Sequence, residues 1–487
     1  MESKMKKDWI EVELEEICQI NLGQSPPSST YNDKEVGLPF FQGKAEFTDF
    51  HPKVVKWCSK PKKIAEKGDV LLSVRAPVGS TNIADQTCAI GRGLAAIRYP
   101  FGYKFPWYFL KLIEKKLDSL GTGTTFKAIS GQTLKSQIIP LPPLPEQRAI
   151  VARIEELFSE LDHAIANLKS AQAKLEIYRQ AVLKKAFEGG LTEEWRRLNH
   201  VSISAKGLLK EIRDEQERWI KEETILGNSE ANRLKSKLKK VKSDFSTLEE
   251  LPFGWTWTTF LESSNLVVDC HNKTAPYQSE GIFLVRTTNV KKGALNLSNG
   301  IKFVSQETFE YWSRRCVPRS GDILFTREAP MGEVAIIPEN TKICLGQRMM
   351  LIRVFNNLVN KKYLYYAIQD PSFQQRMDKS AIGTGVKHLR VGDVENLIFP
   401  ICSPEEQTQI VQEIESRLSV ADKLAETIQI NLLKSESLRQ SILKQAFEGK
   451  LLTEAELDAC RKEADWEHAE KLLERIKGGK KSKNNYG

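Results

Sequence analysis

The sequence predicts an α+β protein built from two tandem-repeated globular blocks, each followed by one long helix. Three observations support this fold class: similar stretches recur in the same order, two long segments repeat apolar residues every seven positions, and short β-branched runs are punctuated by Gly and Pro. A chain of 487 residues also exceeds what one hydrophobic core usually serves. Several folded units are therefore expected.

The internal repeat is clearest where each long helix begins. Residues 141–162 read LPPLPEQRAIVARIEELFSELD, and residues 400–422 read PICSPEEQTQIVQEIESRLSVAD, with Glu-Gln and Ile-Val in one register 260 residues apart. RQAVLKKAFEGGL at 179–191 returns as RQSILKQAFEGKL at 439–451, and GDVLLSVRAPVG at 68–79 returns as GDILFTREAPMG at 321–332. Because the similar stretches keep their order, they indicate duplicated modules.

The two long segments are predicted to be helices that pack on each other. Pro145 suits a first helical turn and Glu146 the positive end of the helix dipole. Apolar residues recur every seven positions, and at about 1.5 Å per residue the first helix would be roughly 60 Å long. The predicted seam consists of Ile154, Leu157, Leu161, Leu168, Leu175, Tyr178 and Val182, with Ile414, Leu418, Leu424, Ile428, Leu438 and Ile442 in the second helix, where Arg417, Asn431 and Ser435 interrupt the heptad.

The globular blocks carry strand and turn signals, with one helix expected in each, at 106–120 and 360–379. Strands are expected over Val70–Leu72 and Ile323–Phe325, after Gly-Asp turns. The predicted organisation is a first globular domain (1–145), a first long helix (146–190), a charged helical linker (191–250), a second globular domain (251–403), a second long helix (404–450), and a C-terminal helical segment with a disordered basic tail (451–487).

Charge is concentrated in the globular blocks. The chain carries +9, and residues 1–145 (20 basic, 15 acidic) and 251–403 (18 basic, 13 acidic) each contribute +5. Such basic blocks suit a polyanionic partner. The eight scattered cysteines include no CxxC pair, and His, Cys and acidic residues show no metal spacing, so free thiols, no metal site and a cytoplasmic location are expected. No apolar run is long enough to span a bilayer, so no membrane partner is expected.

These features resemble the specificity (S) subunit of bacterial type I restriction-modification enzymes. The resemblance is carried by PLPPLPEQRAIV at 140–151, by AFEGGLTEEWR at 186–196, and by a Trp-containing segment that opens each block, with Trp9 in the first and Trp255 and Trp257 in the second. The second copy, PICSPEEQTQIV, keeps only part of the proline run. The resemblance implies two target-recognition domains separated by an antiparallel coiled coil, with pseudo-twofold symmetry.

The resemblance also implies a non-catalytic function. Each recognition domain would read one half of a bipartite, asymmetric DNA target in the major groove, while the helix pair sets the gap and docks methylation subunits. The implied partners are double-stranded DNA, two methylation subunits, and restriction/motor subunits that join through the methylation complex. S-adenosylmethionine, ATP and Mg would belong to those partner subunits, and this chain would hold no cofactor.

Base readout needs paired donors and acceptors on loops of the basic blocks. Four places repeat between the modules and supply the DNA-binding candidates, which are Gln42, Lys44, Arg75, Arg92, Lys127, Arg286, Asn289, Arg327, Gln347, Arg348, Lys387, His388 and Arg390. Each place also has a structural explanation. The arginines can be solvated strand residues, the Gly-Thr-Gly loops at 121–123 and 383–385 plain turns, and His388 an ordinary histidine.

Two alternative functions are open at this stage. A DNA methyltransferase with its own specificity would need an Asp/Asn-Pro-Pro-aromatic tetrad, but DPSF at 370–373 lacks the second proline, and no GxxxxGK[ST] nucleotide loop occurs. We therefore expect no catalytic residues. A two-domain coiled-coil scaffold without sequence-specific DNA binding is the other alternative, and confinement of the basic charge to two blocks argues against it. The salt dependence of duplex binding distinguishes such a scaffold from a DNA-recognition subunit.

Overall fold

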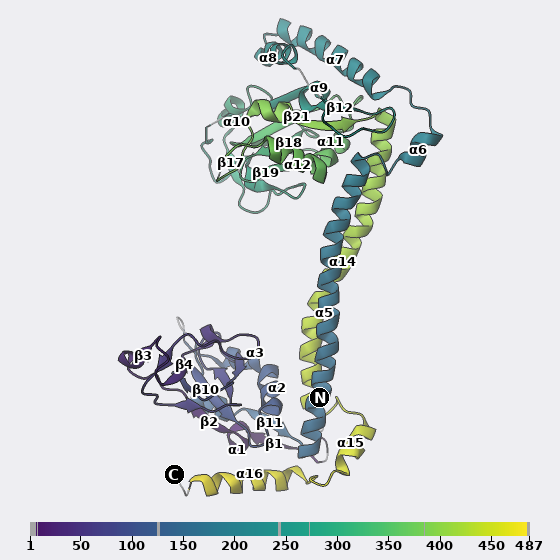
Figure 1. Ribbon diagram of the computed structural model, residues 1–487. Helices are drawn as coiled ribbons and strands as arrows, with labels where there is room; N and C mark the ends of the chain where they lie inside the picture. Colours follow the sequence, from purple (N-terminus) through teal and green to yellow (C-terminus); the bar gives the residue numbers. More distant parts are fainter. Residues whose placement is uncertain are drawn as a thin grey trace. The chain divides into compact units, whose positions relative to one another are not determined.

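A computed structural model describes residues 6, 8–123, 127–241, 245–271, 273–383 and 385–484. The chain forms two compact units: unit 1 comprises Met1–Lys169 and Gln429–Gly487, and unit 2 comprises Ser170–Ile428. The division falls within both long helices, so each unit contains the start of one and the end of the other (Figure 1). The predicted α+β class, with two similar globular parts and two long helices, is confirmed.

Unit 1 contains three sheets, ordered β2-β10-β7-β8, β3-β5-β4-β9-β6 and β1-β11. Its strands are β1 (Ile10–Glu13), β2 (Gln19–Leu22), β3 (Tyr31–Asn32), β4 (Leu38–Phe41), β5 (Trp57–Cys58), β6 (Ile64–Ala65), β7 (Val70–Ser73), β8 (Thr81–Ile83), β9 (Cys88–Ile90), β10 (Leu94–Arg98) and β11 (Ile138–Leu141). Its helices are α1 (Leu14–Ile17), α2 (Lys104–Leu112), α3 (Glu114–Leu120), α4 (Gly131–Lys135), the start of α5 (Leu144–Phe187), the end of α14 (Pro404–Phe447), α15 (Glu454–Arg461) and α16 (Ala469–Asn484), with 3-10 turns η1 (Ser28–Thr30) and η2 (Lys44–Glu46).

Unit 2 repeats this plan with sheets β13-β21-β18-β19, β17-β14-β20, β12-β22 and β15-β16. Its strands are β12 (Thr256–Thr259), β13 (Leu266–Asp269), β14 (Ile282–Val285), β15 (Val290–Lys291), β16 (Ala294–Leu295), β17 (Lys302–Val304), β18 (Ile323–Arg327), β19 (Met331–Ile336), β20 (Ile343–Leu345), β21 (Met349–Arg353) and β22 (Ile398–Ile401). Its own helices are α6 (Glu193–Leu198), α7 (Ala205–Ile225), α8 (Ser229–Leu238), α9 (Phe260–Ser263), α10 (Gln306–Trp312), α11 (Lys361–Gln369), α12 (Pro371–Ser380) and α13 (Val391–Glu395), with the 3-10 turn η3 (Thr287–Asn289).

The repeated Glu-Gln pair fixes the start of each long helix to its globular sheet. The indole Nε1 of Trp9 donates to the buried Glu146 at 2.7 Å, and Trp255 donates to the buried Glu406 at 2.9 Å. The following glutamine is buried too, and its side-chain amide donates to the backbone carbonyl five residues earlier in both copies. These two residue types recur because both buried polar side chains must be hydrogen-bonded.

The repeated Gly-Asp stretches anchor the central sheets. Asp69 is buried and accepts two hydrogen bonds from Arg98, at 2.7 and 2.9 Å, and Asp322 is paired in the same way with Arg353. Each bidentate pair joins the start of β7 or β18 to the end of β10 or β21. The predicted strands after Gly-Asp are confirmed as β7 and β18.

The single helices predicted at 106–120 and 360–379 are wrong, because each position holds two helices. Ile113 leaves helical geometry, with φ −92° and ψ 7°, between α2 and α3. Between α11 and α12, Asp370 caps the second helix through Phe373 N, and Pro371 follows it. A proline removes a backbone donor and restricts the residue before it, so one continuous helix cannot form there.

The long helices contact each other within each unit through equivalent ion pairs. In unit 1 Arg439 pairs with Asp162, and in unit 2 Arg179 pairs with Asp422 at 2.5 Å. Each residue has its counterpart 260 positions away, so the same contact is made with the helices exchanged. This pairing requires the two helices to run antiparallel.

The predicted seam needs one correction. In the first helix, the series from Ile154 to Val182 is buried or half-buried, and in the second helix Ile414, Ile428 and Ile442 are buried. Leu157 and Leu418 are half-buried. Tyr178, Leu424 and Leu438 are instead 41%, 49% and 49% exposed. The second series lies one residue later, where the half-buried residues are Phe158, Ile165, Arg179, Ala425, Leu432 and Arg439. Arginines at seam positions hid this register, since their aliphatic stems pack while their guanidinium groups form ion pairs.

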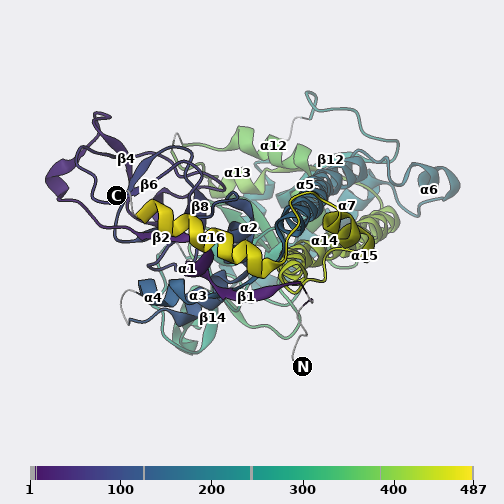
Figure 2. The ribbon, with the colours of Figure 1, turned by 90° about the horizontal axis from the view of Figure 1, so that it is seen from below.

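The segments that follow the long helices pack on equivalent sites. In unit 2, Gln216 of α7 donates to the carbonyls of Leu261 and Ser264 around α9. In unit 1, Lys480 of α16 donates to the carbonyls of Glu15, Glu16 and Cys18 around α1, as α16 runs along that helix (Figure 2).

α16 extends to Asn484, and the ammonium of Lys480 holds the helix on α1, while disorder of the basic tail stays a prediction. Residues 485–487 lie outside the described residues. The eight cysteines are unpaired, as predicted. Among the described helices, none combines the length and apolarity needed to cross a bilayer.

Candidate nucleic-acid interface

The candidate interface of each unit begins at a pair of parallel strands. In unit 1, β4 and β9 are parallel, and in unit 2, β14 and β20 are parallel. Gln42 directly follows β4, and Arg286 directly follows β14. The partner strands β9 and β20 lead into the loops that carry Arg92 and Arg348. Carboxyl ends of parallel strands meet at one sheet edge, so these candidates are brought together.

Close backbone contacts fix these loops. Gly91 N donates to the carbonyl of Phe41 at 2.8 Å, and Gly346 N donates to the carbonyl of Val285 at 2.7 Å. A Cβ atom at Gly93 would lie 2.3 Å from the carbonyl oxygen of Gln42, and one at Gly346 would lie 2.8 Å from that of Val285. The loops therefore approach each other more closely than a side chain permits.

The other two candidate loops join the same edge. Val74 N donates to the carbonyl of Gly93 at 2.9 Å, which brings in Arg75, and Ala76 N donates to the carbonyl of Lys127 at 2.8 Å. In unit 2, Arg327 N donates to the carbonyl of Arg348 at 3.1 Å, as Val74 N does to Gly93 in unit 1. Leu389 N donates to the carbonyl of Arg327 at 3.0 Å, and its counterpart in unit 1 is the bond from Ile129 N to the carbonyl of Val74. All four repeated candidate places thus converge within each unit.

In unit 1, three cations of this edge have accessible side chains. Lys44, Arg75 and Arg92 are exposed, as is Gln42, and none of the three cations forms an ion pair within the described part of the chain. Lys127 is different, because its ammonium pairs with Asp118 at 2.7 Å. That hydrogen bond lowers the pKa of the Asp118 carboxyl. Unit 1 therefore presents a cluster of uncompensated positive charge.

In unit 2, the candidate cations of this edge are mostly engaged in contacts within the unit. Arg286 donates to the carbonyl of Gly300 at 2.6 Å, Arg327 donates to the carbonyl of Leu389 at 3.1 Å, and the guanidinium of Arg348 lies 3.0 Å from the Glu328 carboxylate. Lys387 pairs with Asp378 at 2.5 Å, as Lys127 does with Asp118 in unit 1. The Nε groups of Arg286 and Arg327 are buried without an acceptor among the described residues.

The remaining candidates of unit 2 differ in accessibility. Asn289 is buried, and its side-chain oxygen accepts from Arg286 N at 3.0 Å, so it holds the turn after β14 and is not presented to a ligand. Gln347 is half-buried and accepts from the Thr274 hydroxyl at 3.3 Å. His388 is half-buried and forms backbone bridges, while Arg390 is exposed. Thr384, in the predicted glycine loop at 383–385, lies outside the described residues, as do residues 124–126, which directly follow the loop at 121–123.

Sequence reasoning missed one further segment at this edge. Gln24 N donates to the carbonyl of Ile90, and the Ser25 hydroxyl accepts from Arg92 N at 3.2 Å. In unit 2, Cys270 Sγ donates to the carbonyl of Gly346, next to Gln347. The polar run GQSPPSST at 23–30 was the available signal, but it has no counterpart in the second module and so did not stand out.

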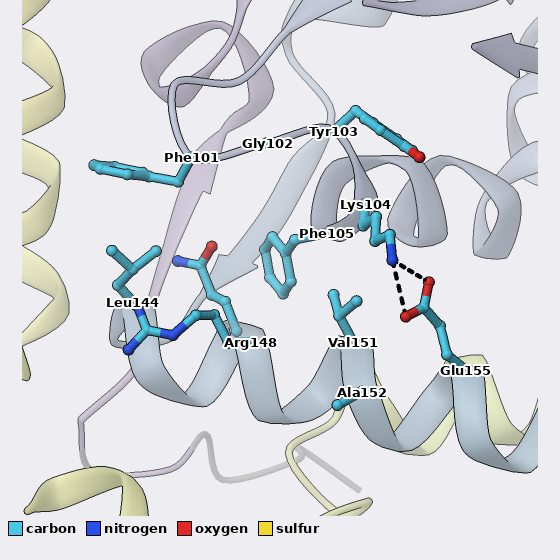
Figure 3. Close-up of a pocket in the computed structure, with 11 residues that line it drawn as sticks. Phe101, Gly102, Tyr103, Lys104, Phe105, Leu144, Arg148, Val151, Ala152 and Glu155 are labelled. Carbon is cyan, nitrogen blue, oxygen red and sulfur yellow. Dashed lines mark hydrogen bonds and ion pairs between the residues drawn. The ribbon is translucent and has the colours of Figure 1, made fainter. Parts of the chain in front are cut away.

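A separate groove of about 370 Å³ lies between the 101–105 loop and the first turns of α5 (Figure 3). Its walls include Phe101, Phe105 and Val151, and the Lys104–Glu155 ion pair closes one end at 2.7 Å. The described residues contain no group of three or more His, Cys, Asp or Glu side chains able to hold a metal ion. The groove brings together no nucleophile and base, and it resembles a packing surface.

The fold and the two converging edges define a class: a nucleic-acid-binding protein with two related modules connected by long helices. Comparison with known proteins gives the family. The family model described as "Type I restriction modification DNA specificity domain" matches twice, at residues 6–170 and 270–434. The chain therefore belongs to the type I restriction-modification specificity family, and the family predicted from its repeated motifs is confirmed.

Relatives and solved structures agree. The chain is 22% identical over 483 residues to the EcoBI specificity subunit of Escherichia coli, covering 97% of this chain and 94% of that protein. It is 46% identical over 159 residues to the putative MjaX specificity subunit of Methanocaldococcus jannaschii, which covers 32% of this chain and 37% of that protein. The fold is similar to a chain in a structure of a type I R-M system (TM-score 0.62, 18% identity, 92% of this chain and 99% of that chain).

It is also similar to the HsdS subunit from Thermoanaerobacter tengcongensis (TM-score 0.52, 19% identity, 92% of this chain and 98% of that chain). Family membership gives the chain a role in recognising DNA targets within a type I system. Specificity subunits are the recognition components of these systems and do not perform the catalysis.

Proposed function

We propose that each unit reads one half of a bipartite, asymmetric DNA target through the loops at its parallel-strand edge. The observation that carries this proposal is that one backbone frame presents different side chains in the two units: Gln42 and Arg92 in unit 1 stand where Arg286 and Gln347 stand in unit 2. Two identical readers would predict a palindromic target. Two diverged readers on one frame predict two different half-sites.

The side chains at these edges suit the major groove. Arginine can donate two hydrogen bonds to guanine, and glutamine can bond adenine in the same bidentate way. The uncompensated cations Lys44, Arg75 and Arg92 also suit phosphate contacts. On this proposal, exposed Gln42 and Arg92 read bases in unit 1, and Arg348, Arg390 and Gln347 do so in unit 2.

We further propose that α5 and α14 set the gap between the half-sites and dock two methylation subunits. Half-sites in successive major grooves on one face of a duplex lie about 34 Å apart, and stiff helices hold such a spacing better than a flexible tether. Exposed apolar side chains on the helices support docking, since Ile177, Val420 and Leu433 are 69%, 59% and 64% exposed. Restriction/motor subunits would join through the methylation complex, and S-adenosylmethionine, ATP and Mg would bind to the partner subunits.

The direct test is the modification pattern of a complete methylation complex that contains this chain. Sequencing of modified adenines should give one motif with two unequal specified parts and an unread gap. Binding of the complex to that motif should weaken with salt at a log–log slope of about −0.9 per phosphate contacted. Binding that barely changes with salt, or modification without a bipartite motif, would favour the scaffold alternative.

The role of the helices has its own test. Whole helical repeats would be added near residues 165–175 together with a matching addition near 425–435, so that the antiparallel pairing is kept. The unread gap should widen while both half-sites stay the same. A gap of unchanged length would reject the proposed spacing role without affecting the two-reader proposal.

A further inference from the structure

Unit 2 carries a helical hairpin, α7 and α8, on its α9 side (Figure 1). α7 has a counterpart in unit 1, because Gln216 of α7 and Lys480 of α16 make equivalent contacts to α9 and α1. Among the described helices of unit 1, none corresponds to α8. This short helix is therefore a feature that distinguishes the two recognition units.

α8 is amphipathic, and its outer face is basic. Leu234 and Leu238 are buried in a cluster with Ile220 of α7 and Leu261 of α9. The basic residues beside these leucines and directly after the helix are Arg233, Lys235, Lys237, Lys239 and Lys240, of which all but the half-buried Lys237 are exposed. Burial of the leucines against α7 and α9 fixes which way the helix faces and leaves Arg233 and Lys235 exposed, and Lys239 and Lys240, directly after the helix, are exposed too.

Two of the five cations are used for internal contacts. Arg233 pairs with Glu230 at 2.5 Å, and Lys237 pairs with Glu395 of α13. Lys235, Lys239 and Lys240 form no ion pair with any described residue. Lysines near a helix C-terminus interact favourably with the helix dipole, which accounts for the position of Lys239 but not for three unpaired cations together.

The basic face of α8 is linked to the recognition edge of unit 2. Arg315 contacts Glu230 of α8 at 3.5 Å and pairs with Asp269, at the end of β13. The next residue, Cys270, donates through Sγ to the carbonyl of Gly346 in the loop of Gln347 and Arg348. Arg314, which is exposed, is next to Arg315 in the chain and lines one pocket with Asp269, Cys270 and Arg315.

We propose that Lys235 of α8 and Lys239 and Lys240, which directly follow it, bind the phosphate backbone of duplex DNA just outside the half-site that unit 2 reads. This inference rests on the proposed function of unit 2 and adds a second contact surface to it. Because the contacts go to phosphates, they add affinity and lengthen the DNA footprint of unit 2 but do not change the sequence recognised. Unit 1, without a counterpart of α8, gains no such extension.

The test uses the complete methylation complex and short duplexes that contain its target. The variant K235Q/K239Q/K240Q should reduce the magnitude of the log–log salt slope by about 2 to 3, since each lost phosphate contact removes about 0.9. The methylated motif should stay the same. Trimming the flanking base pairs at one end of the duplex, and not at the other, should abolish the difference between variant and wild type.

The matched control is K206Q/K210Q/K221Q on α7, which removes three exposed lysines from the same hairpin. This control should keep the wild-type slope. An equal change of slope in both variants, or no change in the α8 variant, would overturn the inference. If the α8 variant assembled poorly with the methylation subunits while its salt slope stayed at the wild-type value, the inference would also be overturned, and the surface would be assigned to a protein partner. Failure of the underlying proposal would look different, because the wild-type complex itself would then show no preference for its target.

Discussion

Units 1 and 2 share a frame and differ in the side chains that the frame presents. Both use a Trp–Glu hydrogen bond at the start of a long helix, a buried Asp–Arg pair in the central sheet, and a Lys–Asp pair beside the glycine loop. At the parallel-strand edge, unit 1 exposes Lys44, Arg75 and Arg92 without ion pairs. Unit 2 holds Arg286 and Arg327 on carbonyl groups and Arg348 on Glu328.

This difference shows which residues stay the same after duplication of a module and which can change. The Trp–Glu and Asp–Arg contacts of the frame involve buried polar groups, and a change in one partner leaves the other unsatisfied, which costs about 1–3 kcal/mol. Exposed loop residues carry no such penalty and can change freely. A duplicated protein with a fixed frame and free loops can therefore acquire two different readers.

The largest expected effect is on the frame of unit 1. Trp9→Phe should destabilise unit 1 by about 1.5–3 kcal/mol, because the Glu146 carboxylate loses a hydrogen bond in a buried site. Trp255→Phe should destabilise unit 2 by less, because Glu406 also accepts from the Thr192 hydroxyl and from Arg196. Amide hydrogen exchange of the assembled complex, followed separately for peptides of each unit, measures both effects. Equal losses would show that the extra partners of Glu406 contribute nothing.

The next effect concerns the reading edges. Arg92→Ala should weaken target binding by about 1–3 kcal/mol, roughly tenfold to a hundredfold, if Arg92 contacts a base or a phosphate. Arg348→Ala should cost less, because Arg348 is already neutralised by Glu328, and Glu328→Gln should strengthen binding by releasing that arginine. Titration of a labelled target duplex with each variant complex measures the differences. If Arg348→Ala lowered the binding free energy more than Arg92→Ala, the proposed difference between the two edges would be contradicted.

A smaller effect is a pH dependence confined to unit 2. Burial raises the pKa of Asp370, the cap of α12, from 3.8 to about 6. A raised folded-state pKa means that protonation favours the folded state, so this contribution to stability is fully present below pH 3.8 and is lost as the pH rises through about 6. Asp370→Asn keeps a capping side chain and should stabilise unit 2 by about 1–2 kcal/mol at pH 8, with no gain near pH 4.

Amide exchange of unit 2 peptides at the two pH values checks this prediction. Unit 1 has Ile113 at the corresponding junction, so its peptides serve as the internal control. A gain of the same size at both pH values would assign the effect to packing and not to the ionisation of Asp370.

Much of this frame could be predicted from the sequence, because the residues that form it recur in both modules. Glu146 and Glu406, in the first turns of the long helices, and the Gly-Asp strands recur in the sequence. A repeated polar residue in an apolar context signals a buried, hydrogen-bonded group. The second seam series was missed because Arg179 and Arg439 occupy positions where a heptad search expects apolar residues. The helix break at Ile113 depends on backbone geometry that no Gly or Pro announces.

The candidate interface was predictable in its loops but not in its side chains. The four repeated places do converge, but whether a residue faces outward depends on local contacts that the sequence does not show. Asn289 looked like a base reader by residue type, yet it is buried under the turn of Arg286. Ser25 lies beside Arg92 through a backbone hydrogen bond and has no sequence echo that would indicate it.

The central claim is that the two units recognise DNA independently on a shared frame. The most direct measurement is to replace residues 1–145 with the corresponding domain of another family member, assemble the complete methylation complex, and sequence the modified adenines. The account predicts that one half of the bipartite motif changes while the other half and the gap stay the same. A change in both halves, or in neither, would contradict it.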